Sequence, residues 1–337
     1  MGPLNAKIVA IGASAGSLEA LRTLLPILPK DDLSILVAVH RASPSDSWLE
    51  KILSRELDCP VIQAEDGASL VPGAVITAPP DRHLLLASGG KLRVTAGPRE
   101  NSSRPAIDPL FRSVAVQAGT RAIGVVMTGY LNDGAAGLAA IRRCGGGALV
   151  QSPDEADYPD MPRAAIAAVP DAEVLTLAAI GARVAELLGA AEGPLVPVPR
   201  DIAAEAAIAE RGGPSMEFED ELGTRSNLTC PHCQGTLWEM NDDAVLRYRC
   251  HTGHAYTADT VWDEQTRRVE EALWSAMRAH RERSEVARRL GEQAKGRLKE
   301  IWARKQAEAH TQAELIRSVL VDLPQGGPSN AEQPPAA

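Results

Sequence analysis

Aromatic residues are scarce in this sequence: Phe, Trp and Tyr together make up 3% of its 337 residues. This scarcity excludes a core built mainly from aromatic side chains, and the 45% of hydrophobic residues are mostly aliphatic. Such a composition suits β-branched strands packed against Ala- and Leu-rich helices, which is an α/β architecture. Because a chain of this length exceeds the usual limit of one hydrophobic core, we expect more than one folded unit.

A basic surplus and long apolar runs are also lacking. The sequence has 35 Lys and Arg against 44 Asp and Glu, a formal net charge of -9, which argues against a nucleic-acid partner. No apolar run approaches the ~20 residues needed to cross a bilayer, and no signal-peptide pattern precedes the first apolar segment. We therefore expect a cytoplasmic protein that is not embedded in a membrane.

Strands and helices alternate over most of the first 190 residues. Apolar runs predict strands at 7–12, 34–39, 122–127, 147–151 and 172–176, and helical patterns lie at 108–118, 133–143, 162–168 and 177–189. This alternation predicts a doubly wound, largely parallel sheet with helices on both faces, a Rossmann-like three-layer α/β fold. Residues 61–94 differ, because Gly and Pro turn signals separate short alternating runs there, and they predict appended antiparallel β-hairpins.

A candidate nucleophile lies at the first strand-to-helix turn. Gly12 to Gly16 satisfy G-x-S-x-G, a context that exposes Ser14 near helix N-terminal amides. A glycine turn that holds a phosphate, or only packs the helix, is the alternative. Only His40 and His83 precede residue 228 as candidate bases, and His40 is preferred because it ends the neighbouring parallel strand. His83, in the hairpin region, is predicted to be a structural histidine.

An orienting carboxylate is expected from another strand end at the same edge of the sheet. Asp133 follows the strand at 122–127 and can serve in this role, with a helix N-cap as the alternative. The chain order Ser14, His40, Asp133 excludes an ordinary α/β-hydrolase, in which the histidine comes last. Amides around Ala15 and the Tyr130 turn are candidate oxyanion donors.

Several separate motifs occur in the order found in one family: Ile11–Ser17, the strand ending in His40, Ala78–His83, Arg104–Asp108 and Met127–Gly134. Over about residues 7–190 the chain resembles the CheB family of chemotaxis protein-glutamate methylesterases. The resemblance implies that Ser14, His40 and Asp133 form a catalytic triad. It also implies a serine hydrolase that needs no cofactor, demethylates glutamate methyl esters on methyl-accepting chemotaxis receptors and acts at receptor clusters. Some members also deamidate receptor glutamines.

Two departures from the family stand out. Chemotaxis members usually carry an N-terminal receiver domain, but six residues precede the first strand here, so we expect no receiver and no control by phosphorylation in cis. Tyr130-Leu131 replaces a Met-Gly pair common in the family. A non-catalytic binding or scaffold module of a signalling complex is the alternative function, and the oligomeric state stays open.

Three of the five cysteines indicate a metal site. Cys230, Cys233, Cys250 and His254 follow the pattern C-x2-C-x16-C-x3-H, which has the ligand types and spacing of a tetrahedral zinc site. Four protein ligands leave no open position, so we expect a structural zinc ribbon too small for a core of its own. A protein partner suits this ribbon better than DNA, since few basic or aromatic residues surround it.

Five segments follow from these patterns. We expect a catalytic domain at 1–190, a linker at 191–228, the zinc ribbon at 229–258, amphipathic helices at 259–322 and a disordered tail at 323–337. A helical hairpin packed on the ribbon is favoured for the fourth segment over a dimerisation or receptor-docking surface. We expect the catalytic domain and the ribbon to be independent, so that Cys230→Ser spares catalysis.

Overall fold

The computed structural model describes residues 6–30, 33–40, 48–191, 193–213, 223–240 and 245–323. These residues fall into two compact units that divide between Thr260 and Val261. The expected tail at 323–337 lies almost entirely outside the described residues, as does the middle of the expected linker.

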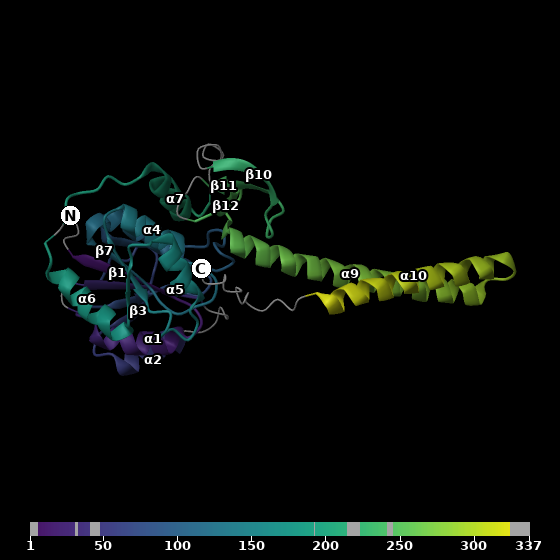
Figure 1. Cartoon of the computed structure of the whole chain (residues 1–337), viewed down its shortest axis with the longest axis horizontal. Helices are drawn as coiled ribbons and strands as arrows, with labels where there is room; N and C mark the ends of the chain where they lie inside the picture. Colours follow the sequence, from purple (N-terminus) through teal and green to yellow (C-terminus); the bar gives the residue numbers. More distant parts are fainter. Residues whose placement is uncertain are drawn as a thin grey trace, which may run out of the picture. The chain divides into compact units, whose positions relative to one another are not determined.

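The first unit is built on a seven-stranded sheet in the order β3-β4-β2-β1-β7-β8-β9 (Figure 1). Its strands are β1 (Lys7–Ala13), β2 (Leu33–Val39), β3 (Val61–Gln63), β4 (Val75–Thr77), β7 (Ala122–Val126), β8 (Gly147–Gln151) and β9 (Glu173–Leu175). Every pairing in this sheet is parallel, so all the strands end at the same edge. The predicted doubly wound α/β fold is confirmed.

Helices cover both faces of the sheet. One face carries α1 (Ser17–Leu24), α2 (Trp48–Glu56) and α6 (Leu177–Gly189), and the other carries α3 (Ile107–Ala118), α4 (Ala135–Arg143) and α5 (Asp160–Ala168) (Figure 1). Side chains alternate along β1: Ile8 and Ala10 join the core under α3 and α4, whereas Val9 and Ile11 join the core under α1. This alternation follows from the two-residue period of a strand that is buried on both faces.

The region of the expected hairpins divides in two. Residues 83–95 form an antiparallel hairpin of β5 (His83–Ala87) and β6 (Lys91–Thr95), as predicted. The short segments β3 and β4 instead extend the main sheet as parallel strands. A glycine turn such as Gly73, with φ +76°, produces the same sequence signal before a parallel strand as in a hairpin.

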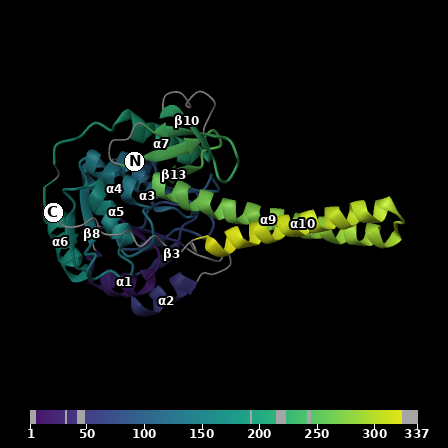
Figure 2. The ribbon, with the colours of Figure 1, turned by 45° about the vertical axis from the view of Figure 1, so that its right-hand side comes forward.

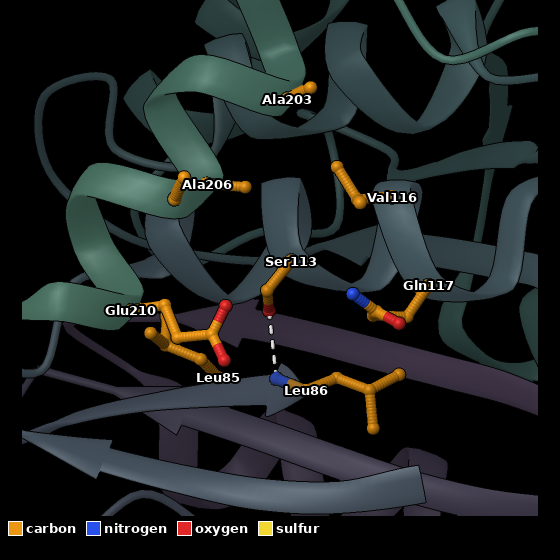
Figure 3. Close-up of a pocket in the computed structure, with 9 residues that line it drawn as sticks. Leu85, Leu86, Ser113, Val116, Gln117, Ala203, Ala206 and Glu210 are labelled. Carbon is orange, nitrogen blue, oxygen red and sulfur yellow. Dashed lines mark hydrogen bonds between the residues drawn. The ribbon is translucent and has the colours of Figure 1, made fainter. Parts of the chain in front are cut away.

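A helix, α7 (Arg200–Arg211), occupies much of the segment expected to be a linker. It packs against α3 and the β5–β6 hairpin through Ile202, Ala206 and Ala209. Figure 3 shows Ala203 and Ala206 facing Val116 across a small cavity, where the Leu86 amide donates to Ser113 Oγ at 2.9 Å. The cavity is lined mainly by aliphatic side chains and is a packing gap.

The Cys/His ribbon, which we define as residues 223–257, is a four-stranded antiparallel sheet in the order β10-β11-β12-β13. Its strands are β10 (Gly223–Thr229), β11 (Thr236–Met240), β12 (Arg247–Cys250) and β13 (Ala255–Thr257). The ribbon and the α/β domain belong to one compact unit, which differs from the expectation of independent parts. The physical link is the set of buried contacts described below.

The second unit is a helical hairpin. Helix α9 (Ala258–Gln293), which begins in the first unit, runs antiparallel to α10 (Arg297–Asp322) (Figure 2). Ser284 Oγ donates to the Gln306 carbonyl at 3.2 Å. Met277, Ala287, Ala309 and Ala313 are buried, whereas other apolar residues of the hairpin, including Val269 and Leu315, are exposed. Within the described residues, none of the helices is both long and apolar enough to cross a membrane.

Candidate active site

Ser14 lies directly after β1, where the chain turns into α1. Its amide donates to the Thr128 carbonyl at 3.0 Å, which ties the turn to the end of the neighbouring strand β7. Gly16 has φ +74° and immediately precedes α1, a left-handed conformation that favours glycine. The serine side chain therefore emerges at the carboxyl edge of the parallel sheet, beside a helix N-terminus.

His40 follows β2, the neighbour of β1 in the sheet. Its Nδ1 lies 3.1 Å from Ser14 Oγ, and its Nε2 lies 2.7 Å from Asp133 Oδ2. Its side chain is 19% exposed, whereas that of Asp133 is 2% exposed, so the imidazole separates a buried carboxylate from the accessible edge. The structure thus brings together the three residues that the sequence singled out.

Asp133 does not cap the helix that follows it. The residue before α4 is Gly134, and the Asp133 carboxylate points instead at the start of α3, where it accepts from Ile107 N at 2.7 Å and Asp108 N at 3.2 Å. Asn101 Nδ2 is a third donor, at 3.0 Å from Oδ1. A helix N-terminus and an amide side chain therefore hold the carboxylate in place.

These contacts decide where negative charge resides. Burial alone would raise the pKa of the Asp133 carboxyl, but His40, Ile107 N and Asn101 outweigh it and hold that pKa below its ordinary value. Burial and the charge of Asp133 raise the pKa of the adjacent Asp108 carboxyl to about 7. The charge of this pair is therefore concentrated on the carboxylate that faces His40.

The three side chains can perform acyl transfer. With Nε2–H donated to Asp133, the Nδ1 lone pair faces Ser14 Oγ and can take its proton. Among the described residues the Ala15 amide has no acceptor, and it lies at the N-terminus of α1, where an oxyanion would be stabilised. The Gly129 amide, in contrast, is occupied by the Tyr158 carbonyl at 2.9 Å.

His83 is placed as a structural residue. Its Nε2 lies 3.0 Å from the Pro98 carbonyl, and the Ala106 amide donates to its Nδ1 at 3.3 Å. Burial is the main cause that lowers the pKa of this imidazole, which favours the neutral ring. His83 therefore ties the β5 strand to the segment before α3.

A second cluster lies in the Cys/His ribbon, where the ligand atoms of Cys230, Cys233, Cys250 and His254 are all within 4.8 Å of one another. Zn–S bonds of about 2.3 Å and Zn–N bonds of about 2.0 Å arranged tetrahedrally would separate these atoms by about 3.5–3.8 Å. The distances from Cys250 Sγ are 3.6 Å to Cys233 Sγ and 3.4 Å to His254 Nδ1. The donor set therefore fits zinc, and His251, which is exposed, lies outside the cluster.

A buried charge network joins the ribbon to the α/β domain. It consists of Glu100, Arg112 of α3, Glu205 of α7, and Arg247 and Arg249 of β12. Glu205 accepts two hydrogen bonds from Arg247, at 2.7 and 3.0 Å, and one from Arg249 at 2.8 Å. Arg249 also donates to Glu100 at 3.1 Å, and Arg112 donates to the other oxygen of Glu100.

Comparison with known proteins identifies the first half of the chain. A sequence model of the family described as CheB methylesterase matches residues 9–184. The chain belongs to the CheB methylesterase family. It is 42% identical over 164 residues to a protein-glutamate methylesterase/protein-glutamine glutaminase of Yersinia pestis, covering 48% of this chain and 47% of that protein. The protein of the same name in Escherichia coli is 41% identical over 170 residues, 49% of each chain.

A solved structure agrees with this assignment. The CheB methylesterase catalytic domain of Thermotoga maritima is 30% identical, with a TM-score of 0.52, and the match covers 54% of this chain and 99% of that domain. The chain spans about half the length of the curated relatives it matches. Ser14, His40 and Asp133 lie within the part that matches the CheB model, and the Cys/His ribbon lies beyond it.

The roles of two residues of the CheB-type site, Asn101 and Asp108, were not predicted from the sequence. Asn101 donates to Asp133 and also to Asp108 Oδ2, at 3.0 Å each. Asp108 Oδ1 in turn accepts from the amides of Gly134 and Gly137, at 3.0 and 2.6 Å. The position of Asp108 at a helix start could have indicated a carboxylate that accepts backbone amides, whereas no local sequence pattern indicates the role of Asn101.

Proposed function

We propose that this chain is a serine esterase that hydrolyses glutamate γ-methyl esters on a protein, converting ester and water into a glutamate carboxyl group and methanol. The observation that carries the proposal is the hydrogen-bonded series Ser14 Oγ, His40 and Asp133 at the carboxyl edge of the sheet. Such a series supplies a nucleophile, a base and an orienting carboxylate in one place.

The reaction follows from this geometry. Ser14 Oγ attacks the ester carbonyl while His40 Nδ1 takes its proton, and the resulting oxyanion is stabilised by the Ala15 amide. The C–O bond to methanol breaks as the imidazolium returns the proton to the leaving oxygen. Water then attacks the acyl-enzyme with His40 again as the base, which releases the glutamate side chain and restores Ser14. Asp133 keeps the proton on Nε2 throughout and stabilises the imidazolium.

The names of the relatives and the resemblance to the family indicate the substrate. Protein-glutamate methylesterase/protein-glutamine glutaminase names both an ester and an amide of the same side chain. We therefore propose methyl-accepting chemotaxis receptors as the substrate, with demethylation as adaptation of a chemosensory signal and deamidation of glutamine as a second reaction. Amide hydrolysis requires the same steps, with ammonia as the leaving group.

A structural zinc in the Cys/His ribbon is the second part of the proposal. Three thiolates and one imidazole saturate a tetrahedral ion, so the metal would bind no substrate. Zinc-binding thiolates also suit the reducing conditions of the cytoplasm, where we place the reaction.

The experiment is to measure methanol released by the purified chain from a methylated cytoplasmic fragment of a chemotaxis receptor. Ser14→Ala should lower the rate by about 10⁴-fold or more without unfolding the protein. Ser88→Ala, which changes an exposed serine at the β5–β6 turn, is the matched control. Equal rates for wild type and Ser14→Ala would disprove the serine mechanism, and no methanol from folded wild type would favour the scaffold function.

A further inference from the structure

The catalytic carboxylate depends on a residue that is itself held by the ribbon. Asn101 is buried, has φ +48°, and lies in a tight turn closed by the Ser103 amide, which donates to the Glu100 carbonyl at 2.9 Å. Ser102 also has a positive φ, +60°, so the turn contains two left-handed residues, a conformation that Asn adopts more readily than most residues other than glycine. Strand β13 contacts this turn.

Strand β13 pairs with the segment that carries Asn101. The Ala255 amide donates to the Arg99 carbonyl at 3.3 Å, and the Asn101 amide donates to the Ala255 carbonyl at 2.8 Å. The Thr257 amide then donates to Asn101 Oδ1 at 3.1 Å, which leaves Nδ2 directed at Asp133. Strand β13 thus provides the hydrogen-bond partners of the Asn101 amide and of Asn101 Oδ1.

The residue before Asp133 is held by β13 and by the start of α9. Asn132 Oδ1 accepts from Thr257 Oγ1 at 2.8 Å and from Thr260 Oγ1 at 3.3 Å, and its Nδ2 donates to Asp259 Oδ2 at 3.0 Å. Asn132 is buried, so leaving its side-chain amide without partners would be destabilising. Asn101 and Asn132, the two asparagines beside the catalytic carboxylate, therefore both accept a hydrogen bond from Thr257.

The position of β13 depends in turn on the Cys/His cluster. The strand begins one residue after His254, and the His254 carbonyl accepts from the Cys250 amide at 2.9 Å. Tyr256, in the middle of β13, places its hydroxyl 3.6 Å from Cys230 Sγ. The ribbon has only a small core of its own, so loss of the metal should loosen β13 even though β12 stays bonded to the α/β domain.

We propose that the Cys/His cluster is a metal-dependent positioning device for the triad: the bound metal fixes β13, and β13 holds Asn101 and Asn132, which keep Asp133 against His40. Asn101 and Thr257 are positioning residues, since they touch neither Ser14 nor His40. The inference rests on the proposed esterase function. It replaces the expectation that the ribbon and the catalytic domain act independently.

The test uses the full chain in two states, zinc-loaded and zinc-depleted with a chelator, with zinc content measured by mass spectrometry. The first readout is the far-downfield proton resonance of the His40 Nε2–H that is shared with Asp133, assigned by its absence in His40→Gln. The second is the rate of labelling by a fluorophosphonate, in which Ser14 Oγ displaces fluoride from phosphorus and His40 takes the proton. Neither readout requires the receptor substrate.

Zinc depletion should abolish the downfield resonance and lower the labelling rate by at least about 10-fold, and added zinc should restore both. Hydrogen exchange in β1 and β7 should stay slow, which shows that the sheet remains folded. A zinc-depleted protein that keeps the resonance and labels within 2-fold of the loaded rate overturns the proposal, and so does a folded protein that binds no zinc.

Variants test the same path with zinc bound. Asn101→Ala should reduce the resonance and slow labelling by about 10-fold or more, and Thr257→Val, which keeps its amide but loses its hydroxyl, should do so to a smaller degree. Thr257→Ser should recover most of the rate, and Thr311→Val, at an exposed site in α10, is the matched control. An unchanged rate in Asn101→Ala overturns the positioning role. Normal zinc-dependent labelling without methanol release from receptor would refute the esterase function alone.

Discussion

Glu205 of α7 provides a quantitative test of how the ribbon is attached. Its carboxylate accepts three hydrogen bonds from Arg247 and Arg249, and Arg112 lies 3.7 Å away. The buried charge network contains three guanidinium groups and two carboxylates, so Glu205→Gln raises its net charge from about +1 to +2. Removing one partner from a buried ionic network typically costs about 3–5 kcal/mol, and we expect a loss of that size in the free energy of unfolding.

The same carboxylate sets a pH dependence. Burial alone would raise the pKa of Glu205, but the charges of Arg247, Arg112 and Arg249 hold it well below its ordinary value. A lowered folded-state pKa contributes stability that is present above the ordinary pKa of glutamate and is lost as the pH falls through the folded-state value. The difference in stability between wild type and Glu205→Gln should therefore shrink in acid.

Urea denaturation of the full chain, followed by circular dichroism at pH 7 and at lower pH, measures both effects. Glu210→Gln is the matched control, because it makes the same change at an exposed position of the same helix. We expect the control to lie within about 0.5 kcal/mol of wild type. A loss of less than about 1 kcal/mol for Glu205→Gln, or a difference that grows in acid, would refute the reasoning.

Two further predictions concern the surroundings of Asp133 and Ser14. Because the folded-state pKa of Asp108 is raised to about 7, wild type should lose stability relative to Asp108→Asn as the pH rises from about 4 to 7, by up to roughly 4 kcal/mol in the free energy of unfolding measured with urea; a pH-independent difference would contradict this. A Cβ at Gly129 would lie 2.1 Å from Met161 Sδ and 2.8 Å from Ser14 Cβ, so Gly129→Ala should slow fluorophosphonate labelling by about 10-fold or more. Gly189→Ala, into open space, should leave the labelling rate unchanged, and equal rates for both would exclude the clash.

Much of the fold could be predicted because parallel strands buried on both faces produce continuous apolar runs. The runs at 7–12 and 34–39 correspond to β1 and β2, and their ends locate Ser14 and His40 at one edge of the sheet. The local sequence pattern thus predicts where each strand ends, and the carboxyl ends of parallel strands lie at the same edge of the sheet. The same logic does not distinguish β3 and β4 from hairpin strands, because three-residue strands carry too little pattern.

The supports of the site could not be predicted in this way. Thr257 lies 156 positions after Asn101, and no periodicity or spacing relates the two. Glu205 looks like one charged residue in an Ala-rich stretch, and only the fold shows that two arginines from β12 face it. Arg112, inside the apolar helix α3, was the one local sign of a buried ionic contact.

The separation between Asn101 and Thr257 also imposes an order of events during synthesis. At about 5–20 residues per second, a ribosome needs roughly 8–30 s to make the intervening chain. Once Asp133 has been made, and for the rest of that interval, the nascent α/β domain has Ser14, His40 and Asp133 but lacks the strand that aligns them. Hydrolytic competence would then arrive late, after translation has passed β13 and the ribbon has acquired its ion, and a prematurely terminated product would be released inert.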